Sequence, residues 1–198
     1  ELQGVLVEYS NTGAGLMEIS HRSAAFSDVV ASADSRMRRA LLIPDDYKVL
    51  FLQGGASLQF YMSALNLTAP TDRTVYLVTG SWSKKAVKEA QRVSDAASIW
   101  EPEDGVYNRV PHDGGWATRD DAVYVHYTTN NTIYGTQWPT EPDAGDLPLV
   151  ADMSSDICSR PIDVSKHALI YAGAQKNLGI AGLTIVIVKK DLIIGKAK

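Results

Sequence analysis

The chain has 198 residues, a formal net charge of −4 and an apolar content of 45%, which is the composition of an ordinary globular protein with one large domain or two small ones. It has no basic run, so nothing supports nucleic acid or an anionic membrane as a partner. Its apolar stretches are far shorter than the roughly 20 residues that span a bilayer. The single cysteine, Cys158, excludes an intrachain disulfide and favours the reducing cytoplasm, and we expect it to be a small buried filler.

The N-terminal part carries turn and helix signals. The chain begins within an expected short helix, residues 11–15 are a predicted turn, and residues 16–20 are a predicted extended entry. Ser23 is a predicted N-cap, and the apolar spacing predicts an amphipathic helix over residues 24–42. We therefore expect residues 1–20 to be an entry segment and residues 21–198 to form one large domain.

The remainder alternates between apolar strands and helices. Strands are expected at residues 48–53, 74–79, 97–100, 122–127, 149–152, 168–171 and 183–189. Helices are expected after the glycine turns at Gly54 and Gly80, the second reaching Val93, and residues 101–120 are an expected excursion. This alternation predicts an α/β fold with a mainly parallel sheet. Ligands of such sheets bind beyond the carboxyl ends of the strands, so the polar residues there are candidates.

Lys176 is the first of these candidates. It follows the strand-like run Ile170–Ala172 and a turn of small residues. A lysine is usually solvated, so a surface residue is the commoner interpretation. However, a lysine that a tight turn delivers at the end of a buried strand can be desolvated, lose its proton and form a Schiff base with a carbonyl compound.

Two glycine turns offer further candidates. Backbone N–H groups and the helix dipole after Gly54 suit a phosphate, with the Ser57 hydroxyl as an added donor, although an ordinary turn also fits. Trp82, after the turn at Gly80, has an indole that suits stacking on a flat aromatic ligand, although a core aromatic residue also fits.

Polar residues also follow two later strands. Asp152 closes the apolar run Leu149–Ala151, where a carboxylate is costly unless it meets a cation such as a protonated ring nitrogen. A cap of the following turn is an equally good interpretation. Thr132 is a possible partner for a ligand oxygen, or part of an Asn-Asn-Thr turn.

The pair His21-Arg22 suits an anionic substrate group, because arginine presents a planar fork to a carboxylate or phosphate, although an exposed pair before a helix fits too. The other histidines do not fall at metal-ligand spacings, and we predict no metal site. The chain contains neither a P-loop nor a G-x-S-x-G motif.

Taken together, these segments resemble the phosphoserine aminotransferase family, which consists of class V, fold-type I enzymes dependent on pyridoxal phosphate (PLP). The resemblance rests on Met17–Ser23, Phe51–Gly55, Val78–Ser83, Asn130–Gly135, Asp152–Ser155, Ser159–Ser165 and Tyr171–Asn177. It implies the large domain of that fold, a homodimer with a shared active site, and transamination between O-phospho-L-serine and 2-oxoglutarate in serine biosynthesis. A role in PLP biosynthesis is a further implication.

The resemblance also implies roles for single residues. Lys176 matches the lysine that binds PLP covalently and then moves the substrate proton. Asp152 matches the carboxylate that pairs with the pyridine nitrogen. Trp82 matches the indole on the ring face, and Thr132 the hydroxyl near the phenolic oxygen. The remaining matches are the phosphate-side positions Ala56, Ser57, Ser154 and Gln175 and the substrate-side positions His21 and Arg22.

Three positions depart from the family pattern: some members carry Arg at the position of Ser57, and Asn131 and Tyr134 replace commoner residues. The family also continues into a smaller C-terminal domain with another substrate-binding arginine, and both ends of this chain resemble cuts. We therefore expect a fragment without a closing helix after its last strand. Another class V enzyme, such as a desulfurase or a small-amino-acid transaminase, and a catalytically silent PLP-domain fragment remain as alternatives.

Overall fold

The structure is a computed structural model that describes residues 2–112, 115–116, 119 and 121–193. Its chain divides into two compact units, Glu1–Ile43 and Pro44–Lys198. The predicted boundary after residue 20 stays a prediction. None of the helices in the described ranges is long and apolar enough to cross a membrane.

The first unit contains helices α1 (Leu2–Val7) and α2 (Ala24–Leu41), which confirms both predicted helices. The Ser23 side chain caps α2 by accepting a hydrogen bond from the Phe26 N–H at 3.2 Å. The predicted extended entry at residues 16–20 is wrong, because this segment is a series of turns. Glu18 closes one of them: its N–H donates to the Gly15 carbonyl, and its carboxylate accepts from the Gly15 N–H, both at 2.9 Å.

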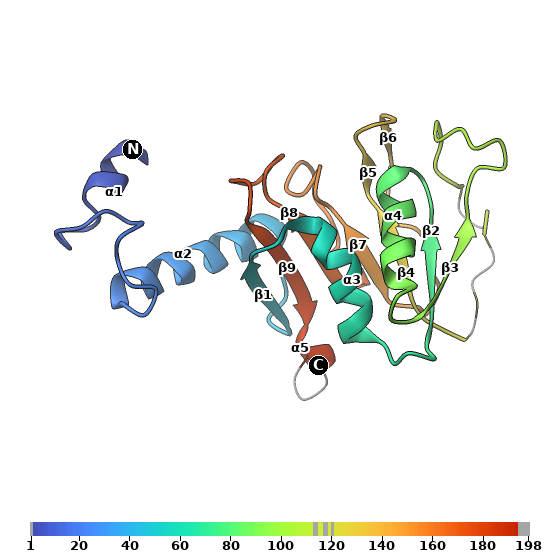
Figure 1. The fold of residues 1–198 in the computed structure, drawn as a ribbon, viewed down its shortest axis with the longest axis horizontal. Coiled ribbons are helices and arrows are strands. Elements are labelled where there is room, and N and C mark those ends of the chain that lie inside the picture. The colour runs from blue at the N-terminus through green and yellow to red at the C-terminus, as the bar shows by residue number, and fades with distance from the viewer. Residues whose placement is uncertain (1, 113–114, 117–118, 120, 194–198) are drawn as a thin grey trace. The chain divides into compact units, whose positions relative to one another are not determined.

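The second unit is built on a sheet whose strands, within the described residues, follow the order β1-β9-β8-β7-β4-β2-β3 (Figure 1). The strands are β1 (Tyr47–Leu52), β2 (Arg73–Leu77), β3 (Asp95–Trp100), β4 (Ala122–Thr128), β7 (Leu149–Asp152), β8 (His167–Gly173) and β9 (Thr184–Lys189). All neighbours from β8 to β3 are parallel, whereas β9 runs antiparallel to β8 and β1. The predicted α/β fold with a mainly parallel sheet is therefore confirmed.

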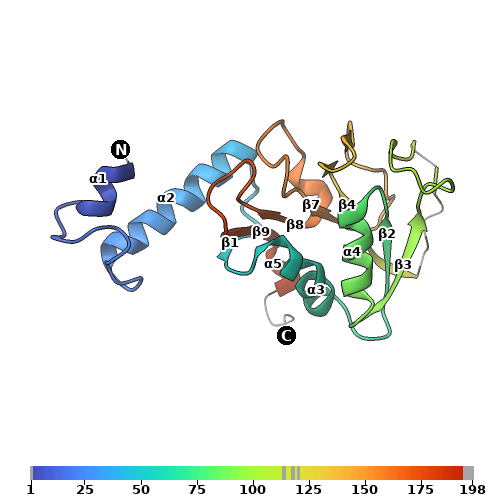
Figure 2. The same ribbon diagram turned by 45° about the horizontal axis from the view of Figure 1, so that its top comes forward.

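Helices α3 (Gly55–Leu67) and α4 (Ser81–Ala90) lie on the same face of this sheet in both views (Figures 1 and 2). Their apolar residues, such as Phe60 and Ala86, pack with sheet residues that include Tyr76, Tyr124 and Tyr171 in one core cluster. The second predicted helix ends at Ala90 rather than at Val93, because turns lead directly into β3. The described part of residues 101–120 contains no helix or strand, as expected for an excursion.

The sequence analysis missed four short elements: β5 (Asn130–Asn131) and β6 (Thr136–Gln137), which form a hairpin, the 3-10 helix η1 (Val164–Lys166) and helix α5 (Lys190–Ile193). Because α5 follows β9, the expectation of no closing helix is wrong, and residues 195–198 lie outside the described residues. The expectation for Cys158 is also wrong. Its side chain is exposed in a turn with φ of 62°, and the preceding Ile157 is the buried residue.

Two buried histidines inside the sheet are paired with tyrosines on other strands. The Nε2 atom of His126 on β4 and the Tyr171 hydroxyl on β8 are 2.8 Å apart, and the His126 ring stacks on Tyr76 at a centroid distance of 4.7 Å. His167 Nε2 lies 2.8 Å from the Tyr127 hydroxyl. Burial lowers the pKa of both histidines, to about 3 for His126, so both imidazoles are neutral at physiological pH.

Candidate functional site

A pocket of about 170 Å³ lies at the carboxyl ends of β1, β4, β7 and β8 and at the start of α3 and α4. It is lined by Gly54, Gly55, Ala56, Ser57, Phe60, Trp82, Thr128, Asn130, Asp152, Ser154, Ser155, Gln175 and Lys176. This is the edge at which parallel sheets bind ligands. The fold thus brings together seven predicted residues from distant parts of the sequence: Ala56, Ser57, Trp82, Asp152, Ser154, Gln175 and Lys176.

Lys176 lies in the turn that follows β8, where the Leu178 and Gly179 N–H groups donate to the Ala174 carbonyl. Its Nζ donates a hydrogen bond to Thr132 Oγ1 at 2.8 Å and lies 5.9 Å from the centroid of the Trp82 ring. Thr132 is not among the residues that line the pocket, but it contacts Lys176, which is. The predicted turn position is confirmed, but the expected desolvation is not, because the Lys176 side chain is exposed.

Asp152 is the last residue of β7 and is only 4% exposed. Its Oδ1 accepts hydrogen bonds from the Ser154 N–H at 3.0 Å and the Ser154 hydroxyl at 2.5 Å. Burial raises the pKa of this carboxyl, and the Ser154 hydrogen bonds and the Lys176 charge oppose that rise. Within the described residues, Oδ2 has no hydrogen-bond partner. A buried carboxylate with one open oxygen is suited to bind a cationic N–H group.

The first turn of α3 borders the pocket at its other end. Gly54 and Gly55 both have positive φ, 99° and 70°, and α3 begins without a side-chain cap. The first N–H groups of a helix have no partner within the helix, and its dipole favours an anion there. At Gly54 a side chain would also meet Leu58 at 2.6 Å. The turn thus leaves backbone donors facing an open site beside the Ser57 hydroxyl.

Two residues that line the pocket each have a buried polar atom without a partner among the described residues: Nε1 of Trp82 and Oγ1 of Thr128. Unpaired buried donors are costly, and they commonly mark a place where a ligand or water binds. Thr128 was missed by the sequence analysis, as were Asn130 and Ser155, whose side chains are hydrogen-bonded to each other at 2.9 Å. Thr128 ends β4, so the same strand-end rule that selected Asp152 would have found it.

His21 and Arg22 belong to the first unit, in an exposed turn directly before α2. Their predicted role in substrate binding stays a prediction. Among the described residues, no group of three or more His, Cys, Asp and Glu side chains could hold a metal ion.

Comparison with known proteins gives consistent matches. The family model described as aminotransferase class-V matches residues 3–195. The chain is 50% identical over 188 residues to the phosphoserine aminotransferase of Desulfotalea psychrophila, covering 95% of this chain and 52% of the relative. For the phosphoserine aminotransferase of Bacillus thuringiensis the identity is 51% over 195 residues, with 98% and 54% covered.

Solved structures agree with these matches. Phosphoserine aminotransferase from Bacillus circulans subsp. alkalophilus superposes with a TM-score of 0.93 at 45% identity, covering 97% of this chain and 53% of that one. A PLP-bound phosphoserine aminotransferase from Trichomonas vaginalis gives a TM-score of 0.90 at 36% identity, with 100% and 55% covered. The chain therefore spans about half the length of the relatives it matches.

Proposed function

Because the chain belongs to the aminotransferase class-V family, we propose that it is the cofactor-binding part of a PLP-dependent phosphoserine aminotransferase. The proposed reaction moves an amino group between O-phospho-L-serine and 2-oxoglutarate, which yields 3-phosphohydroxypyruvate and L-glutamate. It would serve serine biosynthesis and, as a further proposal, PLP biosynthesis. The observation that carries the proposal is the convergence of Lys176, Asp152 and Trp82 on one pocket at the carboxyl edge of the sheet.

The pocket residues fit a flat, phosphorylated and cationic ring. Lys176 supplies the only amine on the described pocket wall, and its distance to Trp82 leaves a ring bound at Nζ within reach of the indole face. The open Oδ2 of Asp152 suits a protonated ring nitrogen, and the Ser154 hydrogen bonds hold the other carboxylate oxygen in place. Trp82 Nε1 and Thr128 Oγ1 remain as unpaired groups for polar atoms of a ligand.

The phosphate would be held at the N-terminus of α3. The donors there are the N–H groups of Ala56 and Ser57, the Ser57 hydroxyl, and Gln175 on the pocket wall. Among the described residues, the first turn of α3 carries no cation, since Ser57 is neutral. The helix dipole and neutral donors therefore carry the binding of the phosphate charge.

When bound, PLP supplies an electrophilic carbonyl carbon and an electron-accepting pyridinium ring. Lys176 would supply the amine that holds the cofactor, and its Nζ would act as the base that takes the proton from Cα of the amino-acid substrate. Thr132 orients that Nζ through their 2.8 Å hydrogen bond. Asp152, a buried carboxyl group, would pair with the ring nitrogen of bound PLP and favour its protonated form, because a carboxylate and a cation stabilise each other at a buried site.

Borohydride trapping tests the proposed role of Lys176. The full chain is incubated with PLP, reduced and digested, and the label is located by peptide mass spectrometry. We expect a single pyridoxyl label on the peptide that contains Lys176, and no label in Lys176→Ala. The exposed surface lysine variant Lys166→Ala is the matched control and should label like wild type. Trapping that survives in Lys176→Ala would refute the assignment.

Substrate, partner and location are proposed together. The substrates are phosphoserine and 2-oxoglutarate, the assembly is a homodimer with a shared active site, and the location is the cytoplasm. The names of the relatives support the substrates, and the family resemblance supports the other two. A transamination assay with phosphoserine against alanine and cysteine tests the substrate, and light scattering tests the dimer. Preference for alanine or cysteine over phosphoserine would favour another class V activity.

A second candidate function is PLP binding without turnover. The pocket residues that fit PLP support this candidate as well as the first. The two candidates differ in one result. Both predict the trapped label on Lys176, but only the first predicts that phosphoserine converts the bound cofactor to its amine form in a single turnover.

A further inference from the structure

The hairpin that carries Thr132 is too small to be stable alone. Its strands β5 and β6 have two residues each and pair only with each other. An isolated hairpin is at best marginally stable in water. The turn between the strands is exposed, with Ile133 61% and Tyr134 42% accessible. Contacts outside the hairpin must therefore fix Thr132, the acceptor for the Lys176 amine.

The first contact is internal and reaches the start of α4 through Asn131, which is 1% exposed. Its Nδ2 donates a hydrogen bond to Thr79 Oγ1 at 2.9 Å, and its side chain packs directly on Gly80. A Cβ atom on Gly80 would lie 2.4 Å from Asn131 Oδ1, so the amide fits only because position 80 has no side chain. Ser83 holds this point rigid, because its hydroxyl accepts from the Thr79 and Gly80 N–H groups at 3.0 Å.

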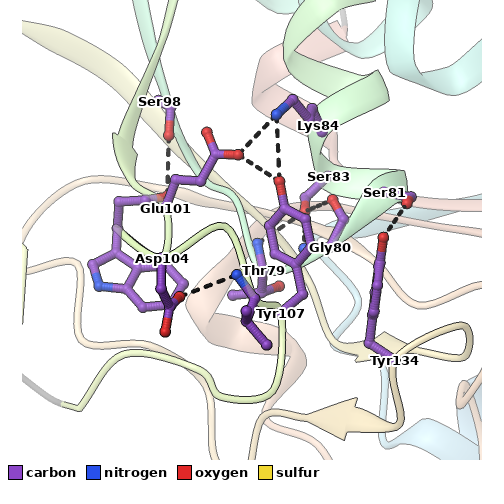
Figure 3. A network of polar contacts seen from close by, with 12 residues as sticks. Thr79, Gly80, Ser81, Ser83, Lys84, Ser98, Glu101, Asp104, Tyr107 and Tyr134 are labelled. Atoms are coloured by element: carbon purple, nitrogen blue, oxygen red, sulfur yellow. Dashed lines mark hydrogen bonds and ion pairs between the residues drawn. The ribbon is translucent and has the colours of Figure 1, made fainter.

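The second contact is on the surface, and Figure 3 shows it from close by. The Tyr134 hydroxyl at the hairpin tip lies 2.9 Å from Ser81 Oγ in the first turn of α4. The Tyr107 ring covers Tyr134 at a centroid distance of 5.0 Å. Tyr107 is itself tied to α4, because its hydroxyl donates to Glu101 and Lys84 donates to the same carboxylate at 2.9 Å (Figure 3).

Both contacts join the hairpin to the helix that carries Trp82. We propose that Asn131 and Tyr134 are positioning residues that fix Thr132 relative to Trp82, and thereby set where the Lys176 amine lies. The importance of that amine rests on the proposed function, but the placement of Nζ is a property of the chain itself. The junction explains why an exposed lysine has a defined position: its acceptor lies on a hairpin that two residues join to the start of α4.

The reactivity of Lys176 measures this placement without cofactor. Trinitrobenzenesulfonate modifies free amines, and peptide mass spectrometry of the full chain gives the rate at Lys176 alone. Thr132→Val removes the hydrogen-bond acceptor, and its modification rate at Lys176 is the reference. We expect this rate to be about fivefold faster than in wild type, because one ordinary hydrogen bond corresponds to a factor of that size. We expect Tyr134→Phe, Ser81→Ala and Asn131→Ala to move the rate toward that reference. Tyr61→Phe, which removes a hydroxyl from a half-buried tyrosine on α3 outside the junction, should leave it unchanged.

A double variant separates positioning from general loosening. If Tyr134 acts through Thr132, Thr132→Val with Tyr134→Phe reacts at the rate of Thr132→Val alone. Wild-type rates in Thr132→Val or in all three junction variants, or a further increase in the double variant, would overturn the proposal. Ser81 is partly exposed and Tyr134 is exposed, so Ser81→Ala and Tyr134→Phe should fold and give a rate even if Asn131→Ala does not fold. PLP uptake by wild type is measured separately, and its absence would count against the proposed function alone.

Discussion

His126 makes the protein sensitive to acid. It is 1% exposed, its Nε2 is 2.8 Å from the Tyr171 hydroxyl, and burial lowers its pKa from 6.5 to about 3. The folded state therefore binds fewer protons than the unfolded state between these two values. Stability from this group is fully present above pH 6.5 and is lost as the pH falls through 6.5 toward 3.

The size of the effect follows from the two pKa values. One pKa unit corresponds to about 1.36 kcal/mol, so lowering the pH from 7 to 5 should remove roughly 2 kcal/mol of unfolding free energy through His126 alone. That is a large share of the unfolding free energy of a typical domain, which is about 5–15 kcal/mol. His167 adds in the same direction, since burial also lowers its pKa.

The assay is urea unfolding of the full chain at pH 7 and pH 5, followed by circular dichroism, for wild type and His126→Gln. The variant is expected to be less stable at pH 7 because it loses the stacking on Tyr76. The quantity to compare is the decrease in unfolding free energy from pH 7 to pH 5, which should be smaller in His126→Gln than in wild type by roughly 2 kcal/mol. All other titrating groups cancel in this difference. His112→Gln, which changes an exposed histidine, is the control and should keep the wild-type loss. Equal losses in wild type and His126→Gln would refute the reasoning.

Three further outcomes are expected. Under the proposed function, Asp152→Ala should lower transamination by orders of magnitude, because the ring nitrogen of PLP loses its carboxylate; near-normal turnover at saturating PLP would contradict this. Tyr47→Phe should lower the urea-unfolding free energy by about 1–2 kcal/mol, because the buried Tyr47 hydroxyl donates to the His167 carbonyl at 2.6 Å; an unchanged midpoint would argue against it. Gly80→Ala should cost about 1–3 kcal/mol through the clash with Asn131, whereas Gly4→Ala, which meets nothing within 4 Å, should not destabilise the chain.

The fold class was predictable because its signal is local. Apolar runs such as Leu149–Ala151 are buried on both faces in a parallel sheet, so each strand can be recognised without knowing its neighbours. The missed elements lack such a signal. β5 and β6 are two residues long, and their hairpin is held by side-chain contacts to distant segments, such as those of Asn131 and Tyr134 at the start of α4 and of Asn130 with Ser155. The predicted burial of Cys158 was wrong because residue type indicates only an average preference for burial. It does not determine which way a side chain points in a turn.

The candidate site was predictable to the extent that it follows strand ends. Asp152 ends β7 and Lys176 follows the end of β8, the neighbouring parallel strand, so the rule for α/β sheets places them at one edge before any coordinates exist. The same rule says nothing about which strands are neighbours. β7 lies between β4 and β8 through pairings that the spacing in the sequence does not encode.

The sequence by itself determined the type of fold, the turn that carries Lys176 and, through the resemblance of its motifs, the family. Only the tertiary structure decided how that lysine is placed. The sequence argument required a desolvated amine, whereas Lys176 is exposed and held by its hydrogen bond to Thr132. The physical reason is that the end of a strand follows from the local apolar pattern of the sequence. The position of the Lys176 amine, by contrast, depends on a contact between residues 44 positions apart. That hydrogen bond joins the hairpin turn to the turn after β8, two segments that come together only in the folded chain.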